Sequence, residues 1–398
     1  MSDTVYSSII PFSVGIICPA DFIKRQPFGG ASGLIENIMV NLGLPCTVFG
    51  IGINGTEPWQ LIELFPNVTF IPVADFSYPA RVPLRFSTLV AYVRARRRIL
   101  RSGINLLYIH SPEVALPFLF FNRNIPVVFH QHGSGNPITR AKFVWARLGI
   151  LEWIFDGILR LIHRRSDWTI AIDEECYAQA EKNGVAHKAT LLMNAVDTDK
   201  FAPDLIARKA TRKQHDIQDD TCVVLFSGRL EEIKRVDRVL EAIKILSDRS
   251  VNIRLFVAGD GTLKSQLESQ VDSDGLSDKV NFLGSVPHHT LPGYYNMADV
   301  LVLTSEMEGT PMVILEALAT GTPVVAPKVG GIPALIKNLS NGIILDEVNP
   351  QTVADAIQRV EGMHLDRESV SRSVSHLNTE SFIRNLRIIF QQILVQRK

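Results

Sequence analysis

The sequence predicts an α/β protein of two domains, each built on a doubly wound parallel sheet. Short apolar runs alternate with segments of helical periodicity along the chain, which is typical of strands joined by crossover helices. The chain has 398 residues, enough for two domains with separate cores. A charged stretch at 194–218 shows little apolar periodicity. We therefore expect a first domain over 1–195, a second over 196–375 and a terminal helical segment over 376–398.

The apolar runs define the expected strands. In the first domain they lie at 14–18, 46–51, 68–71, 106–109, 127–130, 168–172 and 189–192. In the second domain they lie at 222–226, 253–257, 280–282, 300–303, 324–326 and 343–345. Near the C-terminus, apolar residues recur at the spacing of an amphipathic helix, at Phe382, Leu386, Ile389, Phe390 and Ile393.

Composition and charge argue against a nucleic-acid-binding, a secreted or a membrane-spanning protein. Lys plus Arg and Asp plus Glu number 41 each, so no excess of positive charge indicates a nucleic-acid partner. The N-terminus lacks a basic region before its short apolar run, and no stretch reaches 18 uncharged apolar residues. The four cysteines are dispersed without a C-x-x-C pair, as in reduced proteins, at Cys18, Cys46, Cys176 and Cys222. We expect a cytoplasmic protein.

Glu308 and Glu316 lie in a segment that combines several structural signals. A buried-strand pattern precedes them and another follows. Between these runs, Thr310 is expected to be the N-cap of a helix, Pro311 its first residue and Gly321 its C-terminal stop. Both carboxylates should then lie near the carboxyl end of a strand, where open α/β sheets bind ligands. The adjacent helix N-terminus favours anions.

A second segment follows the strand expected at 222–226 and reads Ser227-Gly228-Arg229-Leu230-Glu231-Glu232-Ile233-Lys234. An arginine, a lysine and a helix N-terminus together stabilise the negative charge that develops on a leaving phosphate. Gly259 lies in the turn after the next strand, where a glycine allows backbone to come close to a ligand. That turn is a common one and indicates little by itself.

These segments resemble the G-R-x-x-x-x-K and E-x7-E motifs of the retaining glycosyltransferases of family 4. The resemblance continues into Gly330-Gly331 and Asn341-Gly342 and extends, more loosely, over nearly the whole chain. It implies the GT-B fold, in which two Rossmann-like domains face each other across a cleft and a C-terminal helix crosses back to the first domain. One departure is Ala195, where the family usually has glycine.

The resemblance also implies roles for individual residues. Glu308 would contact hydroxyls of the donor sugar, and Glu316 would contact the nucleotide ribose. Arg229 and Lys234 would bind the donor diphosphate. The other donor-binding positions implied are Gly29, Gly30, Gly228, Gly259, Leu283, Gly309, Thr310, Pro311 and Met312.

The first domain carries a glycine turn and several histidines at expected strand ends. Gly29 and Gly30 open a helix, but their spacing is not the G-x-G-x-x-G of a dinucleotide-binding protein. The family usually has one functional histidine, next to the transferred sugar. His132 fits that register better than His130, which closes a strand and can be a core residue. His110 also ends a strand, with a structural or an acceptor-binding role.

Two D-x-D triplets raise the question of a metal site. Asp197-Thr198-Asp199 lies between the domains, and Asp272-Ser273-Asp274 ends a polar helix. Metal-binding D-x-D motifs of the other glycosyltransferase fold instead end a hydrophobic strand. We interpret both triplets as surface residues and predict no metal and no cofactor.

Arginines concentrate in two stretches of the first domain. Seven lie from Arg81 to Arg101, and within the same stretch one helical stripe is formed by the apolar residues Phe86, Leu89, Val90, Val93 and Leu100. The stretch 138–165 mixes aromatic residues with further basic ones. Either these are helices that contact an anionic bilayer, or they are ordinary helices with a solvated face.

The sequence therefore predicts a metal-independent, retaining glycosyltransferase. It would move a sugar from a nucleotide-diphosphate donor, with a UDP-sugar favoured, to a hydroxyl of a glycan that is lipid-linked or part of a cell-envelope polysaccharide. Glu308, His132, Arg229 and Lys234 are the expected catalytic residues. Two alternatives remain, a non-catalytic nucleotide-sugar-binding subunit of a glycan assembly complex and a GT-B-fold nucleotide-sugar epimerase.

Overall fold

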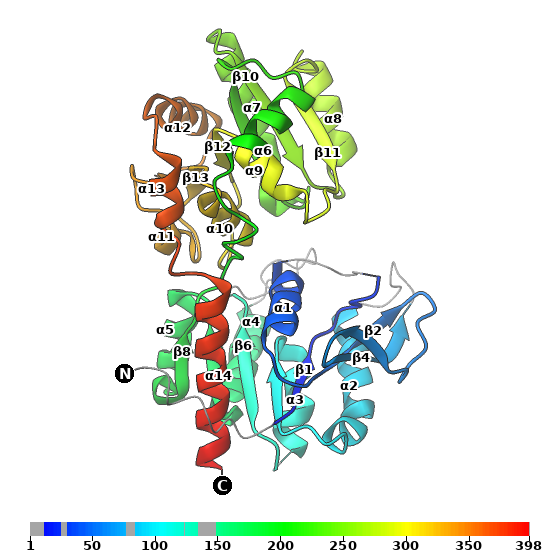
Figure 1. The fold of residues 1–398 in the computed structure, drawn as a ribbon. Helices are drawn as coiled ribbons and strands as arrows, with labels where there is room; N and C mark the ends of the chain where they lie inside the picture. The colour runs from blue at the N-terminus through cyan, green and yellow to red at the C-terminus, as the bar shows by residue number, and fades with distance from the viewer. Residues whose placement is uncertain (1–11, 25–29, 77–83, 123, 134–148, 398) are drawn as a thin grey trace. The chain divides into compact units, whose positions relative to one another are not determined.

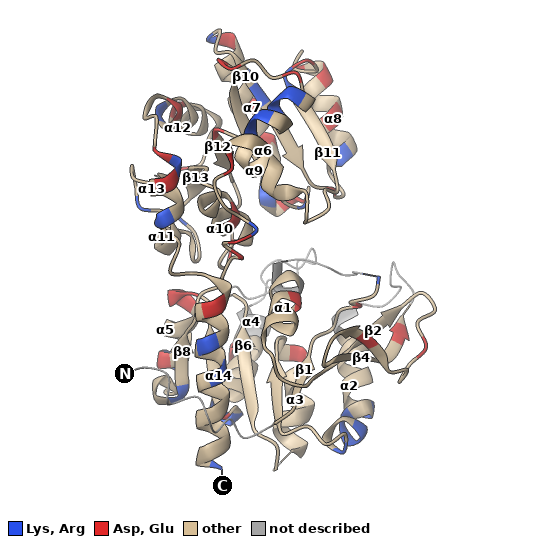
Figure 2. Ribbon diagram, viewed as in Figure 1, with Lys and Arg blue, Asp and Glu red and all other residues tan. Residues whose placement is uncertain are grey.

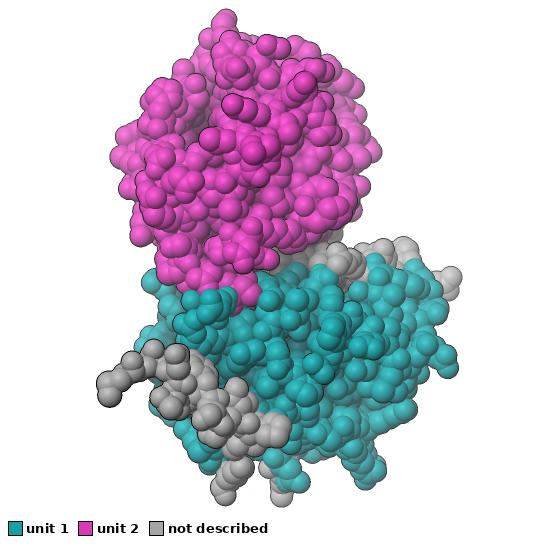
Figure 3. Space-filling model, in the orientation of Figure 1, with its two compact units in different colours: residues 1–193, 380–398 teal, residues 194–379 magenta. Residues whose placement is uncertain are grey.

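The structure is a computed structural model that describes residues 12–24, 30–76, 84–122, 124–133 and 149–397. The chain divides into two compact units, which are described separately (Figure 3). Unit 1 comprises residues 1–193 together with 380–398, and unit 2 comprises residues 194–379. The two ends of the sequence therefore belong to the same unit.

Unit 1 is built on an eight-stranded sheet of order β3-β4-β2-β1-β5-β6-β7-β8 (Figure 1). Only β3 runs antiparallel to its neighbour, β4. The strands are β1 (Val14–Ile17), β2 (Cys46–Ile53), β3 (Ile62–Phe65), β4 (Val68–Phe76), β5 (Leu106–Ile109), β6 (Val127–Gln131), β7 (Trp168–Ala171) and β8 (Ala189–Leu191). The helices are α1 (Gly30–Asn41), α2 (Leu84–Leu100), α3 (Pro112–Phe121), α4 (Gly149–Arg165), α5 (Glu174–Lys182), the short η2 (Ala186–Lys188) and α14 (Thr379–Gln396).

Unit 2 is built on a six-stranded parallel sheet of order β11-β10-β9-β12-β13-β14. The strands are β9 (Cys222–Ser227), β10 (Ile253–Ala258), β11 (Val280–Gly284), β12 (Val300–Val302), β13 (Val324–Pro327) and β14 (Gly342–Leu345). The helices are α6 (Leu205–Gln214), η3 (Glu232–Lys234), α7 (Val236–Asp248), α8 (Lys264–Ser273), α9 (Leu291–Met297), α10 (Met312–Ala319), α11 (Ile332–Leu335), α12 (Pro350–Gly362) and α13 (Arg367–Arg372).

The predicted fold class, two Rossmann-like α/β domains, is confirmed. Every strand expected from an apolar run is present, because strands buried on both faces need continuous apolar sequence. The hairpin partner β3 was missed, since its residues are half-buried or exposed and its run is short. The turn that joins β3 to β4 places Asn67 in a left-handed conformation (φ 64°), which asparagine tolerates.

Each sheet reverses its strand order at one point, between β1 and β5 in unit 1 and between β9 and β12 in unit 2. At such a point the loops that follow the two neighbouring strands diverge and leave a crevice at the carboxyl edge. The expected site residues follow these central strands or their near neighbours. Topology therefore gathers them in two groups, one in each unit.

The C-terminal helix α14 packs on unit 1, as predicted for the GT-B fold. Its Phe390 is fully buried and meets the rings of Phe12 and Tyr108 edge-on, at centroid distances of 6.5 and 5.2 Å. Arg387 Nε donates a hydrogen bond of 2.7 Å to the Leu42 carbonyl. The helix thus completes the apolar layer beside the sheet of the first domain, although it comes last in the sequence.

The expected start of the helix that carries Glu316 is wrong by one residue. Helix α10 begins at Met312, and Pro311 occupies the N-cap position without a side-chain cap. Thr310 is therefore outside the helix, where its carbonyl accepts a hydrogen bond of 2.9 Å from Asn194 Nδ2. The predicted stop holds, because Gly321 has φ 76° directly after the last turn.

Candidate active site

Two glycine turns pack against each other at the carboxyl ends of β9 and β10. Gly228 and Gly259 have φ angles of 155° and 154°, and the Gly228 N–H donates to the Ala258 carbonyl at 2.9 Å. A Cβ on Gly259 would lie 1.8 Å from the Gly228 carbonyl oxygen. Any side chain there would separate the two loops, so the sequence requires glycine at this point.

Lys234 and Glu308 form an ion pair beside these turns. Lys234 ends η3, and its Nζ lies 2.5 Å from Glu308 Oε1. Both side chains are largely buried, with 19% and 11% of their surface exposed. The Thr304 hydroxyl, just after β12, donates to the backbone carbonyls of Lys234 and Arg235. The loops after β9 and β12 are thus fixed to each other, and the predicted phosphate and sugar residues meet there.

Arg229, predicted to share the diphosphate with Lys234, is positioned differently. Its guanidinium pairs with Glu231, two residues along, at 2.5 Å, and its side chain is 63% exposed. Because this pair is solvated, it contributes little to stability and is readily exchanged for a phosphate.

The turn at Gly330 and Gly331 supports the backbone around Glu308. Gly330 has φ 53°, and a Cβ there would lie 1.9 Å from the Glu308 carbonyl oxygen. The Gly331 N–H donates to the Gly309 carbonyl at 2.9 Å. The glycines noted in the sequence thus allow the β13–α11 turn to pack directly on the loop that carries Glu308.

Glu316 lies in the second turn of α10 and is buried. Its Oε2 accepts a hydrogen bond of 2.7 Å from the Tyr295 hydroxyl, and its Oε1 lies 3.0 Å from His288 Nε2. Burial and the nearby Glu316 carboxylate raise the pKa of Tyr295 well above its usual value, so the phenol remains a donor. No sequence motif marks Tyr295 and His288 as partners of Glu316, because only the tertiary fold brings α9 and its preceding loop to Glu316.

The remaining predicted donor residues have varied surroundings. Leu283 is half-buried near the end of β11, and its neighbour Gly284 accepts a hydrogen bond of 2.8 Å from the Gly259 N–H. Met312 is half-buried and begins α10. Gly30 begins α1, whereas Gly29 lies outside the described residues.

The predicted histidines form a cluster in unit 1. His110 follows β5, His130 lies within β6 and His132 follows it. His110 Nδ1 lies 2.8 Å from His132 Nε2, while His130 Nδ1 lies 2.5 Å from the Tyr108 hydroxyl. His110 and His130 are buried and His132 is half-buried. His132 is therefore the member of the cluster that a ligand can reach most readily.

Burial keeps these rings neutral. It lowers the pKa of His132 to about 4, and it holds the pKa of His110 and of His130 well below the usual value, where a charge on His132 acts in the same direction. At neutral pH the cluster can donate and accept hydrogen bonds but carries no charge. It is suited to contact sugar hydroxyls and unsuited to compensate a phosphate.

Both D-x-D triplets are engaged in local structure. Asp197 Oδ1 accepts hydrogen bonds of 3.1 Å from the backbone N–H groups of Asp199 and Lys200. Asp274 pairs with Lys244 at 2.6 Å, and Asp272 accepts from the Ser277 hydroxyl. These contacts fit the surface interpretation of both triplets.

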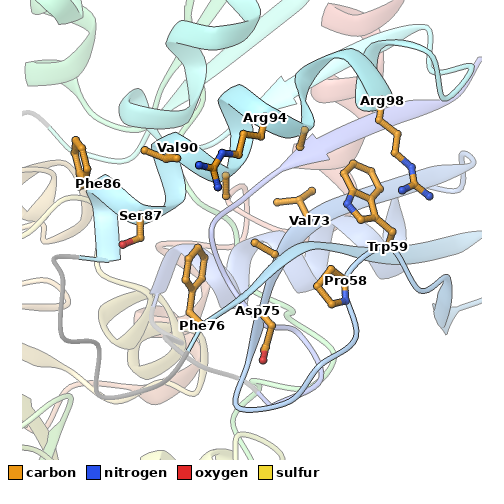
Figure 4. A pocket seen from close by; sticks show the side chains of 13 residues that line it. Pro58, Trp59, Val73, Asp75, Phe76, Phe86, Ser87, Val90, Arg94 and Arg98 are labelled. Atoms are coloured by element: carbon orange, nitrogen blue, oxygen red, sulfur yellow. The ribbon is translucent and has the colours of Figure 1, made fainter.

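A cavity of about 720 Å³ lies in unit 1 between α2, β4 and the loop after β2 (Figure 4). Trp59, Phe76 and Phe86 contribute aromatic walls, and Arg94 and Arg98 project from α2 beside them. Arg98 Cζ lies 4.1 Å from the centroid of the Trp59 ring. The cavity therefore joins apolar surface to positive charge.

Comparisons with known proteins agree with this architecture. The model of the family "Glycosyltransferase Family 4" matches residues 42–200, and that of "Glycosyl transferases group 1" matches residues 207–373. The structure resembles a sucrose-phosphate synthase from Thermosynechococcus elongatus (TM-score 0.81, 21% identity, covering 97% of this chain and 100% of that one). It also resembles WaaG, a glycosyltransferase of lipopolysaccharide biosynthesis (TM-score 0.73, 16% identity, covering 94% and 99%).

The two units thus define a protein of GT-B fold. With one family model matching each half, the chain belongs to the family 4, group 1 glycosyltransferases.

Curated relatives match more locally. An uncharacterized glycosyltransferase of Methanocaldococcus jannaschii is 39% identical over 149 residues, or 37% of this chain and 38% of its own. A GDP-mannose-dependent phosphatidylinositol monomannoside mannosyltransferase of Mycobacterium tuberculosis is 32% identical over 181 residues, or 44% and 47%. The chain thus spans less than half of the length of these relatives.

Proposed function

We propose that the protein is a retaining glycosyltransferase that moves a sugar from a nucleotide-diphosphate donor to a hydroxyl of a glycan. The observation that carries this proposal is the contact between Lys234 and Glu308 at the point where the strand order of unit 2 reverses. A cation for the phosphate and an acceptor for sugar hydroxyls lie side by side there, next to the N-terminus of α10.

In the proposed reaction, the bond between the anomeric carbon and the diphosphate oxygen breaks as the acceptor hydroxyl attacks from the same face. The acceptor proton passes to the departing phosphate oxygen, so no protein base is required. Lys234 and Arg229 compensate the charge that builds up on the diphosphate. Because two cations and a helix N-terminus supply this compensation, we expect transfer without a metal ion.

Glu316 would hold the nucleotide through its ribose. A buried carboxylate accepts hydrogen bonds from a diol more strongly than a neutral group does. In the structure its two oxygens already face two donors, Tyr295 and His288. His288 is 54% exposed, so it can turn aside while Tyr295 keeps the carboxylate in place. Glu308 would orient the sugar, and His132 would contact it.

The acceptor is proposed to be lipid-linked, or part of a cell-envelope polysaccharide, and reached by contact of unit 1 with a membrane. Arginines are concentrated in the C-terminal half of α2, which is coloured blue at its end in Figure 2. Phe86, Phe121 and Trp153 are exposed in the same unit, and Arg96 lies over the Phe121 ring at 4.6 Å. Exposed aromatic side chains beside arginines suit the interface of an anionic bilayer. In the described part of the chain, no helix is long and apolar enough to cross one.

The first experiment is a thermal-shift panel of UDP, GDP and ADP and their sugar conjugates, with and without EDTA. We expect one nucleotide family, with UDP favoured, to raise the melting temperature equally in both conditions. Slow hydrolysis of the matching donor would then exclude a purely binding function. A chelator-sensitive shift would contradict the metal-free site, and no shift at all would contradict the donor assignment.

A further inference from the structure

The three histidines of the cluster in unit 1 are linked by specific ring contacts. The proposed contact with a sugar does not by itself require these contacts. His110 and His132 share a hydrogen bond of 2.8 Å between Nδ1 and Nε2. The Nε2 atoms of His110 and His130 are buried without a hydrogen-bond partner among the described residues. Two nitrogens therefore remain unsatisfied inside the protein, and their protonation states are constrained.

A metal ion is the first occupant to consider, because one ligand nitrogen from each ring lies within 4.8 Å of the other two. Two nitrogens of one tetrahedral zinc site are about 3.3 Å apart, given zinc–nitrogen bonds of about 2.0–2.1 Å. The 2.8 Å contact is shorter and is typical of a hydrogen bond. The ring of His130 is stacked on that of His132, at an interplanar angle of 27° and a centroid distance of 4.4 Å. Lone pairs in the planes of two stacked rings do not converge on one ion, so the cluster is a hydrogen-bonded pair, His110 and His132, with the third ring stacked on it.

The number of N–H groups on the two rings decides which ring donates the hydrogen bond between His110 and His132. Both rings are neutral, so each carries one N–H. If His132 Nε2 donated, the proton of His110 would lie on its own Nε2, which is buried and has no acceptor. Buried N–H groups without an acceptor are rare and cost more than an unused acceptor. His110 Nδ1–H therefore donates to His132 Nε2.

We propose that His110 is a positioning residue that holds His132 as its Nδ1–H tautomer and in one ring orientation. The Nδ1–H of His132 is then a fixed donor for a hydroxyl of the transferred sugar. This last step rests on the proposed function, whereas the hydrogen bond and the tautomer do not. Groups that orient a functional histidine through its second nitrogen are known to act in this way.

The tautomer is tested by long-range proton–nitrogen correlation NMR of the full chain with ¹⁵N-labelled histidine at pH 7.5. Signals are assigned with His110→Asn and His132→Asn. We expect both His110 and His132 to be protonated on Nδ1. An Nε2–H form of His132 overturns the proposal. So does a set of histidine signals that shifts stoichiometrically with added Zn²⁺, which would make the cluster a metal site.

The functional consequence is tested with two variants that differ in where they place an amide. Asparagine puts its N–H₂ near the position of Nδ1, and glutamine puts it near that of Nε2. We expect His110→Gln to lower kcat roughly tenfold to a hundredfold with unchanged nucleotide affinity. We expect His110→Asn to stay within about threefold of the wild type, because the donor is retained.

Equal losses in the two variants, or a change confined to KM, would overturn the positioning role. Melting curves check that both variants fold, and nucleotide binding reports separately on unit 2. If no donor and acceptor pair gives transfer, the proposed function fails. The NMR measurement still decides whether His110 sets the tautomer of His132.

Discussion

In the proposed function, the single contact between Lys234 and Glu308 prepares a site for two ligands. The pair is largely buried, so each group costs free energy if it is left without a partner. On this proposal, a diphosphate would replace Glu308 as the partner of Lys234, and sugar hydroxyls would replace Lys234 as donors to Glu308. The pair thus keeps both side chains oriented in the state that the structure describes.

Lys234→Ala is expected to lower kcat by roughly two to three orders of magnitude, because charge compensation on the leaving diphosphate is lost. Steady-state kinetics with the donor identified by thermal shift measure this loss. Lys328→Ala is the matched control, since Lys328 pairs with Asp346 on an exposed surface of the same unit. Activity close to that of the wild type in Lys234→Ala would contradict the phosphate assignment.

Glu316→Gln is expected to weaken nucleotide binding by roughly tenfold, because a neutral amide accepts hydrogen bonds from a diol less strongly than a carboxylate does. Calorimetric titration with the nucleoside diphosphate checks this. The exposed Glu380, which pairs with Arg384 on α14, provides the control variant Glu380→Gln. Equal affinities of Glu316→Gln and wild type would remove Glu316 from the ribose site.

At the scale of elements, loops are held by backbone packing that only glycine allows. The turns after β9 and β10 touch through Gly228 and Gly259, and the β13–α11 turn touches the Glu308 loop through Gly330. Side-chain chemistry at the site thus depends on positions that carry no side chain. These glycines were visible in the sequence as motif members, but the partner of each is a tertiary fact.

Gly330→Ala is expected to destabilise unit 2 by about 2 kcal/mol or more, because it combines a positive φ with a clash against the Glu308 carbonyl. It should also weaken nucleotide-sugar binding by displacing Glu308. Gly362→Ala is the control, since an added Cβ there meets nothing within 4 Å. Chemical denaturation measures both variants, and equal stabilities would contradict the close-packed turn.

The buried face of helix α2 differs from the apolar stripe expected from its sequence. Its buried positions among the described side chains are Thr88, Tyr92, Ala95 and Ile99, whereas Phe86 is 63% exposed. Replacing Arg97, Arg98 and Arg101 together with Glu is expected to reduce binding to anionic vesicles strongly, at about 1 kcal/mol per basic residue removed. Co-sedimentation with vesicles measures this. The control replaces Lys209 and Lys213 of unit 2 with Glu, and equal losses would point to a general charge effect.

At the scale of the whole molecule, the buried histidines make the stability of unit 1 depend on pH. Unfolded histidine titrates near 6.5, whereas burial lowers the pKa of His132 to about 4 and that of His163, which lies between Gln131 and Asn183, to about 4 as well. Between these values the unfolded chain binds more protons than the folded one. The unfolding free energy is therefore complete above about pH 6.5 and decreases as the pH falls toward 4.

Scanning calorimetry is expected to show the melting temperature of unit 1 falling between pH 7 and pH 5. His132→Asn should flatten this dependence, because it removes one of the groups that must take up a proton on unfolding. The exposed His187 provides the control variant His187→Asn. A slope unchanged in His132→Asn would show that this ring is not held neutral by the fold.

The sequence by itself determined the two sheets and the identity of most donor-site candidates. Strands buried on both faces must be apolar throughout, so their runs can be read directly. Motifs such as Gly228 to Lys234 follow a strand by a fixed number of residues, so they reach its carboxyl edge by local geometry alone. The half-exposed β3 escaped detection because nothing in its short run required burial.

Only the tertiary structure decided which of these groups touch. It paired Lys234 with Glu308, left Arg229 with Glu231, and brought Tyr295 and His288 to Glu316. It also gave the two candidate histidines different partners, because His130 contacts the Tyr108 hydroxyl inside the core while His132 is hydrogen-bonded to His110. Apart from the local pair of Arg229 and Glu231, these contacts join residues 21 to 74 positions apart. Their formation depends on strand order and loop packing, which no local pattern specifies.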